Sequence, residues 1–296
     1  MRHPNNLMNA VFVLLVIVAI LPFVNPSETS AASRFSKLLG FKVHYEIVGD
    51  GSPTLVFIHG WACDRTVWRY QIPEFAKKSS VIAIDLPGHG KSDKPEADYS
   101  IPFFADAVSG VLADAEVEEA VLIGHSMGYA IARDMIKRHV GKINALCIVD
   151  GAYYRIPTEP KALAEWNQSA KNFLKGFYSE NRKAFVDNFM ESFFVPGTPK
   201  AIKDAVKAMV AKTPVEVQNS AMTCLHNPAV WDEKQLKLPV LAVYAESSDL
   251  PPDNEVYLRY LYPNLTYFQW KDVGHYLMME RPEAFNELLK AFLYKQ

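Results

Sequence analysis

Short hydrophobic runs separated by longer amphipathic segments recur along most of the chain. The runs at residues 54–58, 81–84, 120–123 and 143–149 are rich in branched side chains, which is typical of strands covered on both faces of a sheet. Helical spacing fills the intervals, at residues 65–78, 101–115 and 127–139. Because strands alternate with helices, the pattern predicts an α/β fold with right-handed crossovers and a mostly parallel sheet.

The pattern changes at both ends of this region. Residues 42–48 alternate apolar and polar side chains, and Gly49-Asp50-Gly51 follows, so we expect a hairpin at the edge of the sheet. Between residues 153 and 236 the strand signal disappears, and Phe185, Phe189 and Phe193 recur at the four-residue spacing of a helix. We interpret this stretch as a helical insertion within one domain.

Strands and helices resume after the insertion, at residues 239–244, 255–261, 265–270 and 282–293. The chain therefore divides into a first part of the core at residues 33–152, the insertion at residues 153–236, and a second part of the core at residues 237–296. Pro73 is expected to interrupt or cap the helix predicted at residues 65–78.

The N-terminus carries the signal for localisation. Arg2 precedes an apolar stretch at residues 10–24, and a segment of small residues follows at residues 27–33. This order is typical of a secretory signal peptide, here residues 1–32, with cleavage after Ala31 or Ala32. We expect export to the periplasm or beyond the cell, and membrane anchoring if the segment is retained.

The composition of the chain indicates which classes of binding partner to expect. The 31 basic and 33 acidic side chains give a formal net charge of -2, so no global field favours nucleic acid or an anionic membrane. We expect a small-molecule substrate and no stable membrane association after signal removal; the oligomeric state stays open. The three cysteines form no CxxC pair, Cys147 lies in an apolar run, and a disulfide between Cys63 and Cys224 stays open.

Gly124-His125-Ser126-Met127-Gly128 joins a predicted strand to a predicted helix. This is the setting of a nucleophile elbow, in which the serine occupies a strained turn and the glycines remove side chains that would clash. A serine hydroxyl needs an aligned base to act as a nucleophile. His275, in a loop just after the strand predicted at residues 265–270, is the candidate for that base.

A carboxylate should orient the imidazole and stabilise its cation. Asp249, in the loop after the strand at residues 239–244, is our first choice. Asp150, at the end of the strand at residues 143–149, is the main alternative, and Glu246 and Asp253 follow. The amides of Met127 and Trp61 are expected to donate to the oxyanion.

Four motifs in this order resemble those of the α/β-hydrolase family, in particular its members with a helical cap. They are His59-Gly60-Trp61, residues 85–93, the elbow, and Gly274-His275. The resemblance runs from residue 41 to the C-terminus. It implies a mostly parallel eight-stranded sheet flanked by helices, with a helical cap insertion, and it implies a structural role for the loop that contains His89. The chain departs from the family at Tyr129, where a second glycine is usual, and before Asp249, where there is an extra residue.

The sequence therefore predicts a serine hydrolase that cleaves a small, apolar carboxylic ester through a Ser-His-Asp triad and an acyl-enzyme, with no metal or organic cofactor. Lactones, amides and carbon-carbon bonds stay open as substrates. The alternatives are a hydroxynitrile-lyase-like enzyme, a C-C bond hydrolase and a non-catalytic receptor for a small ligand. Aromatic side chains of the insertion either line an apolar pocket or form the core of the cap: Phe173, Phe177, Phe185, Phe189, Phe193 and Phe194.

Overall fold

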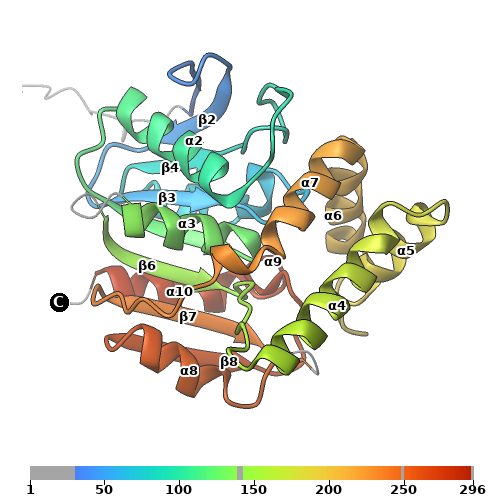
Figure 1. Cartoon of the computed structure of the whole chain (residues 1–296). Coiled ribbons are helices and arrows are strands. Elements are labelled where there is room, and N and C mark those ends of the chain that lie inside the picture. Colours follow the sequence, from blue (N-terminus) through green and yellow to red (C-terminus); the bar gives the residue numbers. More distant parts are fainter. Residues whose placement is uncertain (1–30, 139–142, 248–249, 295–296) are drawn as a thin grey trace, which may run out of the picture.

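The computed structural model describes residues 31–138, 143–247 and 250–294. Within them, one sheet has the strand order β1-β2-β4-β3-β5-β6-β7-β8 (Figure 1). Strands β4, β3, β5, β6, β7 and β8 are parallel, whereas β2 is antiparallel to both β1 and β4. The strands are β1 (Ala32–Ser36), β2 (Val43–Val48), β3 (Thr54–Ile58), β4 (Val81–Ile84), β5 (Ala120–His125), β6 (Ile143–Val149), β7 (Val240–Ala245) and β8 (Leu265–Trp270). The predicted mostly parallel, eight-stranded sheet is confirmed.

Helices cover both faces of this sheet. In Figure 1, α2 and α3 lie in front of the strands and α10 lies behind them. The helices of the core are α1 (Ile72–Phe75), α2 (Ile101–Asp114), α3 (Met127–Arg138), α8 (Asn254–Leu261), α9 (Leu277–Glu280) and α10 (Pro282–Leu293). Every residue of β4 and β5 is buried, as expected for strands covered on both sides.

The helix predicted at residues 65–78 is divided in two. A short 3-10 helix, η1 (Arg65–Trp68), precedes α1, and Pro73 occupies the first turn of α1. This place suits proline, because the amide that it lacks would have no partner within the helix.

The predicted hairpin has a different turn from the one expected. Strand β2 pairs with β1, which the hydrophobic pattern did not predict, and not with β3. The segment Gly49-Asp50-Gly51 instead passes close to the backbone before β4, where a Cβ on Gly51 would lie 1.9 Å from the carbonyl oxygen of Lys78. Strand β1 was not predicted, because three of its five residues are exposed and its sequence contains no hydrophobic run.

The insertion is helical, as predicted. It consists of α4 (Pro160–Phe177), α5 (Arg182–Glu191), α6 (Lys200–Lys212), α7 (Val215–Leu225) and a short 3-10 helix, η2 (Pro228–Val230). Helices α4 to α7 lie beyond the carboxyl ends of the strands (Figure 1), and we call residues 153–236 the cap. No helix among the described residues is long and apolar enough to cross a membrane. The predicted signal segment falls almost entirely outside the described residues.

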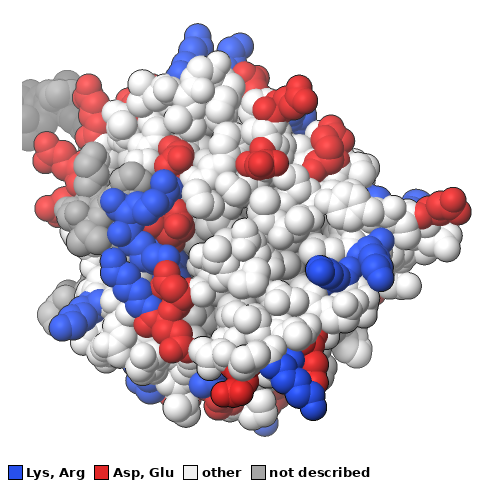
Figure 2. Space-filling view, viewed as in Figure 1, with Lys and Arg blue, Asp and Glu red and all other residues white. Residues whose placement is uncertain are grey.

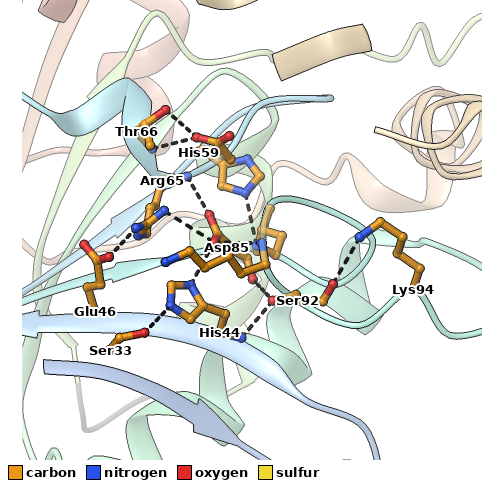
Figure 3. A network of polar contacts seen from close by, with 12 residues as sticks. Ser33, His44, Glu46, His59, Arg65, Thr66, Asp85, Ser92 and Lys94 are labelled. Carbon is orange, nitrogen blue, oxygen red and sulfur yellow. Dashed lines mark hydrogen bonds and ion pairs between the residues drawn. The ribbon is translucent and has the colours of Figure 1, made fainter. Parts of the chain in front are cut away.

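A largely buried polar network joins the strands β1 and β2 to the loops that follow β3 and β4 (Figure 3). Asp85 lies at its centre and accepts hydrogen bonds from His44 Nδ1 and from the amides of Arg65 and Lys91. Burial opposes the charge of Asp85, but these hydrogen bonds outweigh it and lower its pKa to about 2. The network fixes the loop of residues 85–93, consistent with its predicted structural role.

His89 lies in that loop, fully buried. Its Nδ1 donates to the carbonyl oxygen of Pro87 at 2.8 Å, and burial is the main cause that lowers its pKa to about 3. The imidazole is therefore neutral at ordinary pH and packs against the ring of His59, with ring centroids 5.1 Å apart.

On the face shown in Figure 2, basic and acidic side chains lie next to one another and form no extended patch of one sign. Arg138, for example, pairs with both Asp106 and Asp134. This mixture agrees with the small net charge of the chain.

Candidate active site

Ser126 lies in the sharp turn between β5 and α3. Its φ angle is 52°, in the left-handed region that costs energy for a residue with a side chain. The glycines on either side are sterically required: a Cβ on Gly124 would lie 2.6 Å from the carbonyl oxygen of Gly128, and a Cβ on Gly128 would lie 2.4 Å from that of Ile58. The sequence thus folds locally into the predicted elbow.

His275 lies in the loop between β8 and α9. Its Nδ1 is 2.6 Å from Oδ2 of Asp150, which directly follows β6. The other oxygen of Asp150 accepts a hydrogen bond from the amide of Ala245 at 2.8 Å. Both side chains retain a little exposure, 14% for His275 and 15% for Asp150. The carboxylate therefore fixes the imidazole with Nδ1 protonated and Nε2 free to accept a proton.

The structure brings Asp150, the alternative candidate for the acid, next to His275, the candidate base. Asp249 lies outside the described residues. The other two candidates have different partners: Glu246 faces Lys271 at 3.9 Å, and Asp253 pairs with Arg155 at 2.6 Å. Asp150 reaches the histidine because β6 lies between β5 and β7, and because its own φ of 43° turns the chain sharply at the strand end.

The backbone of His275 is also held. The carbonyl oxygen of His275 is 3.0 Å from Nε2 of His125, the residue before the candidate nucleophile. Since a carbonyl only accepts, Nε2 of His125 carries the proton. Burial, followed by the nearby His275, lowers the pKa of His125 well below its usual value, so the ring is a neutral donor. Sequence reasoning gave His125 no role, because its partner is a backbone atom from a distant loop.

Ser126 and His275 line one cavity of about 170 Å³ between the core and the cap. Among the described residues no hydrogen bond joins the two side chains, and the side-chain hydrogen bond of His275 is the one to Asp150. The walls are mainly apolar and aromatic; besides these two residues they comprise Gly60, Trp61, His125, Ala152, Tyr154, Phe189, Phe193, Met222, Leu225 and Tyr276.

Two of the six cap phenylalanines, Phe189 and Phe193, line this cavity. Phe173, Phe177 and Phe185 pack on one another as the core of the cap, and Phe194 stacks on Tyr276. The sequence did not single out Met222 and Leu225. Their three-residue spacing places both on one face of α7, but the same spacing is typical of side chains that pack in a core.

The amides of Trp61 and Met127 flank the elbow, in the loop after β3 and at the first residue of α3. Neither amide donates a hydrogen bond to another residue in the described part of the chain. The loop that carries Trp61 is fixed by His59, whose Nδ1 donates to Gly60 O at 2.8 Å and whose Nε2 accepts from the amide of Leu86. The Trp61 side chain packs against Phe177 and donates to the carbonyl oxygen of Gln218. The two free amides are the kind of donors that stabilise a developing negative charge.

The departure from the family pattern at Tyr129 has a clear structural outcome. The Tyr129 ring fills the space beneath Gly151, where a Cβ would lie 2.7 Å from it, and its hydroxyl lies 2.8 Å from that of Tyr262.

Cys63, Cys147 and Cys224 are all free thiols, so the disulfide left open between Cys63 and Cys224 is not formed. Among the described residues no cluster of three or more His, Cys, Asp or Glu side chains has the arrangement of a metal site.

Comparison with known proteins agrees with this architecture. Residues 55–288 match the profile of the Alpha/beta hydrolase family. The AB hydrolase superfamily protein YisY of Bacillus subtilis is 25% identical, over 83% of this chain and 93% of the relative. The pimeloyl-[acyl-carrier protein] methyl ester esterase of Aeromonas hydrophila is 27% identical, over 85% of this chain and 99% of the relative.

Among solved structures, a bromoperoxidase from Bacillus anthracis superposes with a TM-score of 0.76 at 22% identity, covering 90% of this chain and 100% of that one. At this identity the likeness concerns the fold alone. The match to the family profile extends over most of the chain, from β3 into the last helix. The chain therefore belongs to the alpha/beta hydrolase family of enzymes.

Proposed function

We propose that this hydrolase cleaves esters of small, apolar carboxylic acids through an acyl-enzyme on Ser126. The observation that carries the proposal is the shared cavity of Ser126 and His275, together with the 2.6 Å contact between His275 Nδ1 and Asp150. A neutral imidazole whose Nδ1–H is held by a carboxylate has the tautomer needed to take a proton at Nε2.

In the proposed mechanism, Ser126 Oγ attacks the ester carbonyl while His275 Nε2 takes the hydroxyl proton. The amides of Trp61 and Met127 donate to the oxyanion. Collapse of this intermediate transfers the proton from His275 to the leaving alcohol and leaves an acyl-Ser126. Water, deprotonated by the same histidine, then attacks the acyl group and releases the acid. Asp150 stabilises the imidazolium ion in both steps.

The substrate class follows from the cavity. Its volume of about 170 Å³ is small, and its walls include Trp61, Phe189, Met222 and Leu225. Pockets for drug-sized ligands are larger, about 300–1,000 Å³. We therefore expect short aliphatic or small aromatic acyl groups to fit and long acyl chains to be rejected. The related methyl ester esterase from Aeromonas hydrophila is consistent with ester chemistry.

A series of 4-nitrophenyl esters of increasing acyl length tests the proposal. We expect the highest kcat/KM for short acyl chains, a decline at longer ones, and a stoichiometric acyl adduct on Ser126 in mass spectra of the quenched enzyme. Failure to trap an adduct, together with no turnover of the esters, would favour the lyase-like alternative. Tight binding of a small ligand without turnover would favour the receptor.

We further propose that the protein is exported after cleavage near Ala31 or Ala32 and acts on a small-molecule substrate without nucleic acid or stable membrane association. N-terminal sequencing of the protein recovered from cells tests the cleavage. Recovery of a membrane-bound protein that still begins at Met1 would contradict it.

A further inference from the structure

The cap contacts the loop of the candidate base directly. The amide of His275 donates to the carbonyl oxygen of Phe193, just beyond the end of α5, at 2.8 Å. The ring of Phe193 stacks on the imidazole of His275, with centroids 4.5 Å apart and planes inclined by 28°. The approach requires a glycine beside the histidine, because a Cβ on Gly274 would lie 2.5 Å from the carbonyl oxygen of Phe193.

A second link runs through Glu280 at the end of α9. One carboxylate oxygen accepts from the amide of Gly274 at 3.1 Å, and the other accepts from the hydroxyl of Thr198, in the cap, at 3.0 Å. Thr198 is buried and Glu280 is half-buried. Glu280 therefore ties the residue before the base to the cap segment that begins at Phe193.

These contacts complete the restraint of His275. Its amide is bonded to Phe193, its carbonyl to His125, and its Nδ1 to Asp150, which leaves Nε2 as the only polar group for the reaction. The elbow and β6 supply two of these bonds, and the cap supplies the third together with the stacked ring. The orientation of the base thus depends on a part of the protein that lies outside the core.

We propose that the cap holds the general base in place, so that seating of the cap and alignment of His275 are one event. Phe193, Thr198 and Glu280 act as positioning residues. Phe193 touches His275, Glu280 touches Gly274, and Thr198 acts through Glu280; the bond changes are left to Ser126 and His275. This proposal rests on the proposed function of His275. It implies that displacement of the cap, for example during substrate entry, withdraws the base from its reactive orientation.

A kinetic comparison of two cap variants tests the proposal. Phe193→Leu removes the stacked ring, and Phe185→Leu is the matched control, because Phe185 packs on Phe173 and Phe177 inside the cap. With 4-nitrophenyl acetate, whose acyl group is too short to depend on the apolar walls, we expect Phe193→Leu to lower kcat roughly tenfold or more, since small displacements of reacting groups cost that much. KM should change little, and the control should keep the wild-type kcat.

If Phe193 only lined the acyl pocket, Phe193→Leu would raise KM for longer esters and leave kcat for the acetate unchanged, which would overturn the proposal. Thr198→Val provides a second test. It removes the bond to Glu280 from the cap side, together with the bond that the Thr198 hydroxyl accepts from the amide of Val195 within the cap. Its matched control is Thr223→Val, whose hydroxyl contacts the exposed Tyr178 elsewhere in the cap. We expect kcat to fall in Thr198→Val and to stay unchanged in Thr223→Val.

A spectroscopic measurement separates this proposal from the proposed function. The short bond from His275 Nδ1 to Asp150 should give a far-downfield proton resonance that is absent in Asp150→Asn. The resonance should shift or broaden in Phe193→Leu and Thr198→Val and persist in both controls. Because it needs no turnover, it reports on the base even if no ester is hydrolysed. A resonance and an acetate kcat that match wild type in both test variants would refute the cap's role.

Discussion

The described residues contain two serine–histidine–aspartate arrangements that differ in their surroundings, and the one at the cavity has the surroundings of an active site. In the first, Ser33 Oγ is 2.8 Å from His44 Nε2, and His44 Nδ1 is 2.8 Å from Asp85 (Figure 3). In the second, His275 Nδ1 is 2.6 Å from Asp150 Oδ2, and the His275 and Ser126 residues line the same cavity. By hydrogen bonding alone, the first arrangement is the more complete.

Their environments differ in three respects. His44 and Asp85 are fully buried, whereas His275 and Asp150 keep some exposure at the cavity. Ser33 extends from an edge strand, whereas Ser126 occupies a strained turn, and the amides of Trp61 and Met127 in the adjoining segments donate to no other described residue. Asp85 also accepts hydrogen bonds from two backbone amides, and its Oδ2 lies 3.6 Å from Nη1 of Arg65. It therefore stabilises two loops as well as the orientation of His44. Acyl transfer needs room for the substrate and donors for the oxyanion, and a chain of hydrogen bonds provides neither.

The largest expected effect comes from removing each serine in turn. Ser126→Ala removes the proposed nucleophile, and we expect kcat for a short ester to fall by a factor on the order of 10⁶, the size of loss that removal of a nucleophilic serine causes. Ser33→Ala should leave kcat and KM at wild-type values. Steady-state hydrolysis of 4-nitrophenyl acetate measures both, and a large loss in Ser33→Ala would show that the first arrangement takes part in catalysis.

Replacement of the two candidate acids, Asp150 and Asp249, should give the next largest loss of kcat. Asp150→Asn keeps the size of the side chain but no longer stabilises the imidazolium ion or holds the correct tautomer, so we expect kcat to fall by about 10⁴. Asp249→Asn is the matched control and should stay near wild type. The same ester assay compares the two variants, and the opposite ranking would assign the acid to Asp249.

Local motifs explain why much of the site could be predicted. The turn around Ser126 is set by the two flanking glycines and by the strand and helix that adjoin it, all within a few residues. His275 follows a recognisable strand, so its place at the same edge of the sheet could also be predicted. The hydrophobic runs of β3 to β7 indicated the sheet in the same way, because strands covered on both faces have few polar side chains.

The acid and the cap contacts could not be predicted in this way. Whether Asp150 or a residue after β7 reaches His275 depends on loop conformations at two neighbouring strand ends. The bonds from His275 to Phe193 and to His125 involve main-chain atoms, which leave no trace in residue type. Strand β1 was missed for a related reason, since it is held by pairing with β2 and by few buried side chains.

The buried arrangement should affect stability more than turnover. Asp85→Asn replaces the charge that His44 and Arg65 face in the interior, and we expect it to lower the free energy of unfolding by about 3 kcal/mol. The kcat of the remaining folded enzyme should change far less than in Asp150→Asn. Urea unfolding followed by fluorescence measures the free energy of unfolding. Active-site titration gives the concentration of folded enzyme to which kcat is normalised. A stability equal to wild type would show that the network is dispensable.

The smallest effect is a pH dependence that separates the two arrangements. The pKa of Asp85 is about 2 in the folded protein, against about 3.9 in an unfolded chain, so the unfolded state binds the proton more readily. Its stabilisation is complete above the unfolded value and is lost as the pH falls through the folded one, a change of about 2.6 kcal/mol. Asparagine does not titrate, so the stability difference between wild type and Asp85→Asn should narrow between pH 5 and pH 2. Urea unfolding at a series of pH values measures it; a difference that stays constant would mean that the charge on Asp85 does not stabilise the fold.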